Sequence, residues 1–164
     1  MKILFEISGL NEIGKIVHKV RENIERNNDI ICCEIWDDSR KKLSSEDIRE
    51  INPDLFVNFD LAGFEQNTLM GNVSFNLLEC KQIHILTNRE LPNEKYLEKQ
   101  LSISMFFYCT HLVQYRYLLE KYSDMPYLKQ MDGWRDRYDE KSIEENANVL
   151  LAVIDEVMNI CHMN

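Results

Sequence analysis

The sequence predicts an α/β fold in which helices cover both faces of a five-stranded parallel sheet. Short apolar runs alternate with segments of helical period, and each intervening segment is long enough to carry the chain back across a sheet. The apolar runs are also nearly continuous, as expected for strands that are buried on both faces. They span Lys2 to Ser8, Asp29 to Trp36, Leu55 to Phe59, Gln82 to Leu86 and Ser102 to Tyr108.

The composition fits a single α/β domain over residues 1–164. Hydrophobic residues make up 45% of the chain and charged residues 29%, while there are only five glycines and three prolines. A chain of this length can bury a sizeable core without disulfides or metals. We therefore expect it to fold throughout.

Charge and cysteine content restrict the partners and the compartment. The 19 Lys and Arg residues face 28 Asp and Glu residues, and the net charge of −9 disfavours binding to nucleic acid or to an anionic membrane. The five cysteines form no CxxC pair, which is typical of reduced, buried thiols. The N-terminus lacks the features of a signal peptide and no apolar run is long enough to cross a bilayer, so a cytoplasmic location is expected.

Helical periodicity marks the segments between the strands. Asn11 is expected to cap a helix whose buried stripe is Ile13, Ile16, Val17, Val20 and Ile24. Further helices are expected from Ser44 or Ser45 to Ile51, over 68–80, over 92–101, and from Thr110 to Tyr122 with Leu112, Val113, Leu118 and Leu119 inward.

A long extra helix is expected at the C-terminal end of the sequence. Ser142 followed by Glu145 predicts a capping box at its start. Its apolar stripe comprises Ile143, Ala147, Leu150, Leu151, Ile154, Val157, Met158 and Cys161. The stripe could cover the sheet or pair with another subunit.

The segment Gly9 to Ile16 matches the first seven positions of the phosphate-binding P-loop pattern, between a strand and a helix. At the eighth position Ile16 replaces the Ser or Thr that would hold magnesium, and Glu12 places a carboxylate inside the loop. We interpret the segment as a strand-to-helix turn that needs its glycines for backbone reasons.

Asp60 directly follows the third apolar run, at the edge where open α/β sheets bind ligands. The stretch PDLFVNFDLAG resembles the third strand of response-regulator receivers, with Asp60 at the phosphoacceptor position and Thr87 at the switch-threonine position. Ile7 and Ser8 stand where receivers have an acidic pair, and Cys109 stands in place of the lysine. The resemblance therefore implies a degenerate receiver.

The chain also resembles the Rossmann-like N-terminal half of GT-B type glycosyltransferases. The resemblance rests on the opening strand MKILFEISG, the "PDL" strand and the segment KYSDMPYL, and it covers most of residues 1–130. The half of these enzymes that binds the nucleotide sugar has no counterpart in this sequence. The resemblance implies a stand-alone accessory module, or one that requires a partner chain.

Two residue clusters remain to be interpreted. Cys109 with His111 and Cys161 with His162 combine thiol and imidazole groups, but no pair has zinc-site spacing, so no metal site is predicted. Trp134, with Arg135, Arg137 and Tyr138, could clamp an anion or simply anchor a loop whose acids neutralise the arginines. The sequence indicates no particular cofactor.

Together these patterns predict a three-layer sandwich with a flavodoxin-like, Rossmann-like sheet and a cleft at the carboxyl ends of its strands. The expected ligand-binding residues are Gly9, Asn11, Asp60, Gly63, Asn88 and His111. The favoured function is a non-catalytic or partner-dependent module, accessory to sugar-nucleotide glycosyl transfer. The alternatives are a small enzyme with Asp60 as its base and a receiver-like regulator. The expected partners are a protein or a second copy of the chain, or a small-molecule or nucleotide-sugar ligand.

Overall fold

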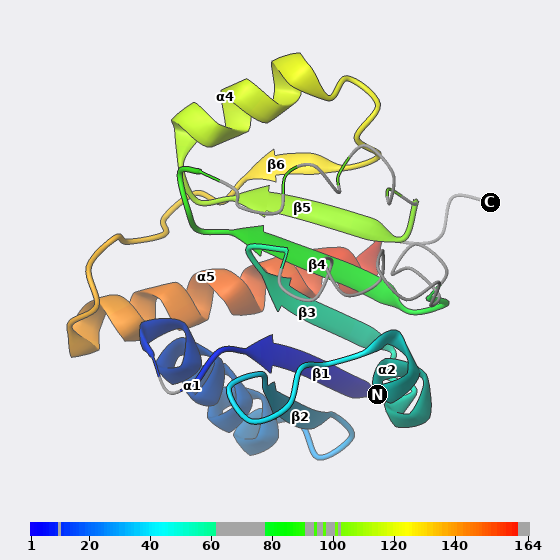
Figure 1. Cartoon of the computed structure of the whole chain (residues 1–164). Coiled ribbons are helices and arrows are strands. Elements are labelled where there is room, and N and C mark those ends of the chain that lie inside the picture. Colours follow the sequence, from blue (N-terminus) through cyan, green and yellow to red (C-terminus); the bar gives the residue numbers. More distant parts are fainter. Residues whose placement is uncertain are drawn as a thin grey trace.

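The computed structural model describes residues 1–9, 11–61, 78–90, 94, 97, 101 and 103–160 (Figure 1). Within these ranges the chain forms six strands and four helices. The strands are β1 (Lys2–Ile7), β2 (Cys32–Asp37), β3 (Leu55–Phe59), β4 (Lys81–Leu86), β5 (Met105–Cys109) and β6 (Leu128–Gln130). The helices are α1 (Glu12–Asn27), α2 (Ser45–Ile51), α4 (Leu112–Lys121) and α5 (Glu140–Asn159).

All six strands are parallel, in the order β2-β1-β3-β4-β5-β6. The first five have the flavodoxin-like order that the sequence predicts, and β6 corrects the expected number of strands. With only three residues, β6 has neither an apolar run nor an alternation that could mark it. Its position depends instead on the backbone, because Phe107 N–H donates to the Tyr127 carbonyl over 3.0 Å and Met131 N–H to the Cys109 carbonyl over 2.7 Å.

Helices cover both faces of the sheet, as the three-layer prediction requires (Figure 1). On one face α1 and α5 pack against each other and against strand residues such as Phe5, Val57 and Ile85. On the other face α2 and α4 contribute Ile48 and Leu118 to a second apolar cluster. The sheet is therefore buried on both sides, which explains the continuous apolar runs.

The first two helices begin where the sequence predicts. The Asn11 side chain accepts a hydrogen bond from Gly14 N–H over 3.0 Å, and the predicted stripe of α1 is buried or partly buried against the core. Ser44 caps α2 in a reciprocal capping box with Asp47. Both predictions are confirmed.

The predicted start of α5 is wrong. Asp139 is the N-cap and accepts a hydrogen bond from Ser142 N–H over 2.8 Å, so Ser142 lies inside the first turn. Glu145 pairs with Arg135 over 3.2 Å instead of capping the helix. Asp139 supplies an acceptor three residues before Ser142, and a carboxylate there also interacts favourably with the helix dipole.

The predicted stripe of α5 is confirmed as far as the described residues reach. Ala147, Leu150, Ile154 and Val157 are buried, and Ile143, Leu151 and Met158 pack beside them. At the other end of the helix Lys81 Nζ donates to the carbonyl oxygens of Val157 (2.8 Å), Met158 (3.3 Å) and Ile160 (2.8 Å). A lysine thus satisfies carbonyls that the helix end leaves without partners and complements its dipole.

The inward face of α4 also differs from the prediction. Leu118 is buried, but Leu112 is 41%, Val113 77% and Leu119 51% exposed, and the buried partner of Leu118 on the helix is Gln114. Residues four apart share one helix face, so α4 packs through a narrow face that a count of apolar residues does not reveal.

The remaining predictions lie largely outside the described residues. They are the helices over 68–80 and 92–101, together with Gly63 and Cys161.

Candidate functional site

Five of the six predicted ligand-binding residues follow the carboxyl ends of parallel strands. Gly9 and Asn11 follow β1, Asp60 follows β3, Asn88 follows β4 and His111 follows β5. These residues therefore lie along one edge of the sheet. The strand order reverses between β1 and β3, which is where open α/β sheets bind ligands.

The Asp60 side chain connects the end of β3 to the loop after β4 through hydrogen bonds. Its Oδ1 accepts the backbone N–H groups of Thr87 over 2.7 Å and Asn88 over 3.0 Å, and its Oδ2 accepts the Thr87 hydroxyl over 2.5 Å. Asp60 has a left-handed backbone, with φ of 51°, a region in which Asp and Asn are enriched among non-glycine residues. Both carboxylate oxygens are thus engaged by the chain itself.

Gly9 and Gly14 come close together in the connection between β1 and α1. Gly9 has a φ of +77° and donates its N–H to the Asp37 carboxylate over 2.9 Å. A Cβ on Gly14 would lie 2.5 Å from the Gly9 carbonyl oxygen, so only glycine allows this approach. The N–H groups of Gly9 and Gly14 are both bonded to side chains.

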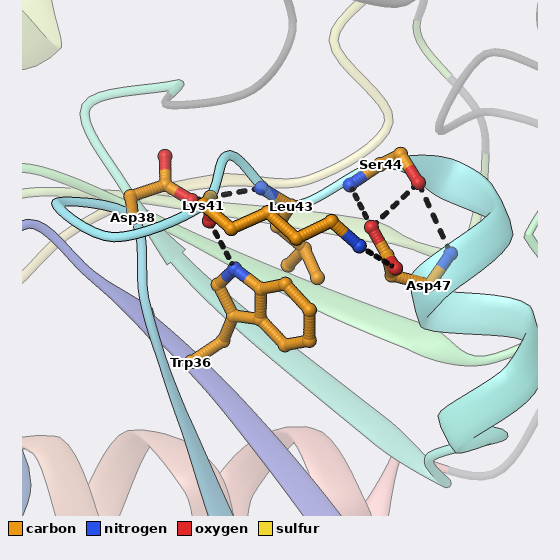
Figure 2. Close-up of polar contacts among 6 residues, drawn as sticks. All are labelled: Trp36, Asp38, Lys41, Leu43, Ser44 and Asp47. Carbon is orange, nitrogen blue, oxygen red and sulfur yellow. Dashed lines mark hydrogen bonds and ion pairs between the residues drawn. The ribbon is translucent and has the colours of Figure 1, made fainter.

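The loop after β2 is held by a set of side-chain contacts (Figure 2). The Trp36 indole donates to the Lys41 carbonyl over 2.6 Å, and Lys41 Nζ reaches Asp47 Oδ1 over 2.6 Å. Asp38 Oδ1 accepts Leu43 N–H over 2.9 Å. These contacts fix the Asp38 side chain, which is 1% exposed, at the same edge of the sheet.

A buried row of polar side chains crosses the sheet just below this edge. Asn58 lies opposite His84 in the register of β3 and β4, and Glu6 is the next residue along β1 after the Phe5–Val57 pair. The Asn58 amide donates to Glu6 Oε2, and its Oδ1 lies 3.5 Å from His84 Nδ1. Sequence reasoning missed Glu6 and Asn58 as partners, because their alignment depends on the strand register.

The surroundings of the row favour uncharged forms of its end residues. Burial is the main cause that raises the pKa of Glu6 well above its usual value, and the neighbouring Asp38 carboxylate raises it further. Glu6 Oε1 is buried and has no hydrogen-bond donor among the described residues. Burial also lowers the pKa of His84 to about 3, and its neutral ring stacks on Phe107.

His111 does not stand free in the cleft. Its Nε2 lies 2.9 Å from the Thr87 carbonyl, which can only accept, and its Nδ1 lies 3.6 Å from an Asp136 oxygen. The neighbouring Cys109 thiol is buried, and desolvation raises its pKa to about 12. In the described part of the chain no group of three or more His, Cys, Asp or Glu residues is placed to hold a metal ion.

The connection between β6 and α5 runs along the same edge of the sheet (Figure 1). Trp134 is 9% exposed and belongs to the core, as expected of a loop anchor. Burial and the nearby carboxylates of Asp136, Glu12 and Asp60 raise the pKa of Tyr138.

The fold and this edge define a Rossmann-like α/β protein with a flavodoxin-like strand order. Comparisons with known proteins return no match: no family model fits the chain, and neither a curated protein nor a solved structure aligns significantly with it. The likenesses to glycosyltransferases and receivers stay predictions. No helix within the described ranges is both long and apolar enough to cross a membrane.

Proposed function

We propose that the chain is a Rossmann-like binding module that performs no chemistry by itself and acts as an accessory to sugar transfer from a nucleotide sugar. The observation that carries this proposal is the engagement of both Asp60 oxygens by Thr87 and Asn88. A general base must reach the proton that it removes. Asp60, the one acid at this edge that the sequence singles out as a base, instead holds two loops together.

The closed glycine turn supports the same conclusion. In a P-loop, free backbone N–H groups surround the phosphate. Here the Gly9 N–H donates to the Asp37 carboxylate and the Gly14 N–H donates to the Asn11 side chain. Neither of these two N–H groups is therefore available to the phosphate of a nucleotide.

The strand order supports binding at this edge. The strand order reverses between β1 and β3, and such a reversal is the usual ligand position in open α/β sheets. A small-molecule or nucleotide-sugar ligand, or a partner chain that completes the site, would be recognised here.

Thermal unfolding with a panel of sugar phosphates, nucleotides, nucleotide sugars and divalent cations tests the proposal. We expect a saturable rise in the melting temperature with at least one sugar-containing ligand, retained in Asp60→Asn, and no turnover of any compound. Turnover that disappears in Asp60→Asn would overturn the proposal in favour of a small enzyme. A panel without any shift would overturn recognition of a small-molecule ligand and leave a partner chain as the expected occupant of the site.

A degenerate receiver is the second candidate, and the Asp60–Thr87 contact favours it. Receivers place an aspartate and a threonine at these two strand ends, and the two side chains are 2.5 Å apart here. Incubation with acetyl phosphate and magnesium, followed by mass spectrometry of the intact protein, tests this candidate. A phosphoryl adduct lost in Asp60→Asn would support it, and the unmodified mass would reject phosphotransfer.

A further inference from the structure

Two buried carboxyl groups lie on one face of the sheet, on the neighbouring strands β1 and β2. Glu6 is 1% exposed and stands opposite Trp36 in the register of these strands. Asp38 comes two residues after Trp36, and its N–H continues the ladder by donating to the Ile7 carbonyl over 2.8 Å. Alternate residues of a strand share one face, so Asp38 lies on the face of Glu6.

Few groups around Glu6 can balance a negative charge. The Asn58 amide donates to its Oε2, whereas its Oε1 has no donor in the described part of the chain. Burial is the largest cause that raises the pKa of Glu6, the Asp38 carboxylate raises it further, and the Lys42 ammonium lowers it. The Lys42 side chain is 61% exposed, so water screens its charge. His84, beyond Asn58, is uncharged, because burial lowers its pKa to about 3.

The Asp38 side chain also holds the loop after β2, residues 38–44 (Figure 2). Its Oδ1 accepts the Leu43 N–H over 2.9 Å, and within the same loop the Trp36 indole donates to the Lys41 carbonyl over 2.6 Å. Glu6 belongs to β1, which is paired with β2 on one side and β3 on the other. Asp38 is therefore the carboxylate of the two that can move away.

We propose that Glu6 and Asp38 form a pH-sensitive switch: when Glu6 loses its proton to water, the Asp38 carboxylate is repelled, its bond to the Leu43 N–H breaks and the loop after β2 opens. Like charges in a poorly solvated site repel each other more strongly than in water. The loop stays closed while Glu6 is protonated and opens as the pH rises. The switch lies at the sheet edge of the proposed function, but it does not require a ligand.

Trp36 supplies the reporter for a test on the full chain. Its indole is bonded inside the loop, and Lys41 Nζ lies 5.2 Å from its ring centroid. We expect the tryptophan fluorescence to change in one step between about pH 5 and about pH 9, while the far-ultraviolet circular dichroism stays constant. Trp36→Phe should remove the step, because Trp134 belongs to the apolar cluster on the other face of the sheet. Hydrogen exchange of the Leu43 N–H, corrected for its intrinsic pH dependence, should accelerate over the same range.

Four variants assign the step to its groups. Glu6→Gln should abolish it, whereas Glu34→Gln, which changes a more exposed glutamate of β2 paired with Lys2 over 3.2 Å, is the matched control and should keep it. Asp38→Asn retains an oxygen for the Leu43 N–H without the charge, so the step should also be lost. Lys42→Met removes an exposed cation that lowers the pKa of Glu6, so the step should move to higher pH.

Several results would overturn the inference. Constant fluorescence of the parent chain over this range would refute the switch. A step that persists in Glu6→Gln would assign the titration to another group, and a step that persists in Asp38→Asn would exclude repulsion of Asp38 as its cause. An unchanged midpoint in Lys42→Met would count against Glu6 even if Glu6→Gln failed to fold. Loss of circular dichroism together with the step would mean global unfolding and not a local opening of the loop.

Discussion

The Asp60 carboxylate accepts both the backbone N–H and the hydroxyl of Thr87, and so ties the end of β3 to the end of β4. The sheet edge that the sequence predicts as a ligand site is therefore stabilised by Asp60, the residue that would be the base if the chain were a small enzyme. This relationship leads to the first of four predictions.

Asp60→Ala should lower the free energy of unfolding by about 2 kcal/mol, because it leaves the Thr87 and Asn88 donors without their charged acceptor. Thr87→Val should cost about 1 kcal/mol, since it removes only the hydroxyl contact. Urea unfolding measures both. Asn88→Ala is the control, because Asn88 contributes its backbone N–H and not its side chain. Equal stability of Asp60→Ala and the parent chain would show that the contacts of Asp60 with Thr87 and Asn88 do not stabilise the fold.

Gly14→Ala should destabilise the fold by about 2 kcal/mol or more, because the new Cβ would overlap the Gly9 carbonyl oxygen and force the turn to shift. Denaturant unfolding measures the loss. Lys15→Ala changes the exposed neighbouring position and should be nearly neutral. If Lys15→Ala lowered the unfolding free energy as much as Gly14→Ala, the overlap with the Gly9 carbonyl oxygen would not explain the loss.

The stability of the parent chain should fall as the pH rises above the unfolded-state pKa of Glu6, which is about 4.5 for an ordinary glutamate. The raised pKa means that the folded state holds the proton longer than the unfolded state, so each step up in pH favours unfolding. The loss is complete once the pH exceeds the folded-state pKa, and each pKa unit of difference corresponds to about 1.36 kcal/mol.

Glu6→Gln removes this titration and keeps the size of the side chain. The stability difference between Glu6→Gln and the parent chain should therefore grow in favour of the variant from about pH 4 to pH 8. Urea midpoints at several pH values measure the difference. A difference that is constant with pH would show that Glu6 ionises alike in the folded and unfolded states.

Asn146 holds the connection that precedes α5. Its amide donates to the Arg135 carbonyl over 2.9 Å and its Oδ1 accepts Arg135 N–H over 2.7 Å, and the side chain is fully buried. Asn146→Ala should lower the free energy of unfolding by about 2–3 kcal/mol, since it leaves the N–H and the carbonyl of Arg135 without hydrogen-bond partners. Asn148→Ala, at an exposed position two residues later, should be nearly neutral. Similar losses in the two variants would argue against a specific role for Asn146.

Much of the fold follows from the sequence for identifiable reasons. Strands β1, β3 and β4 lie within one residue of the predicted bounds, because their apolar runs are continuous and turn residues follow them. The predicted start of the second strand at Asp29 lies three residues before β2 begins at Cys32. Ile30 and Ile31 look like strand residues, but Ile30 is 81% exposed and lies before the first residue pair of the ladder, Lys2 with Cys32.

The candidate site was predicted less well, because it depends on alignment between distant segments. The position of Asp60 at a strand end could be inferred, but its bonds to Thr87 require the register of β3 against β4. The same holds for the row of Glu6, Asn58 and His84. The burial of Gln114 depends on the narrow face through which α4 packs, and the sequence does not reveal that face.

The packing of α5 against α1 has a consequence for how the protein is made. Helices from opposite ends of the sequence share one apolar cluster, and Lys81 joins the last turn of α5 to the middle of the sheet. Such contacts between segments far apart in sequence slow folding and leave apolar surface open until the later segment arrives. During synthesis, apolar residues of β4 such as Ile83 and Ile85 therefore stay uncovered on one face until α5 has left the ribosome, and the nascent chain is most exposed to aggregation and chaperone binding in that interval.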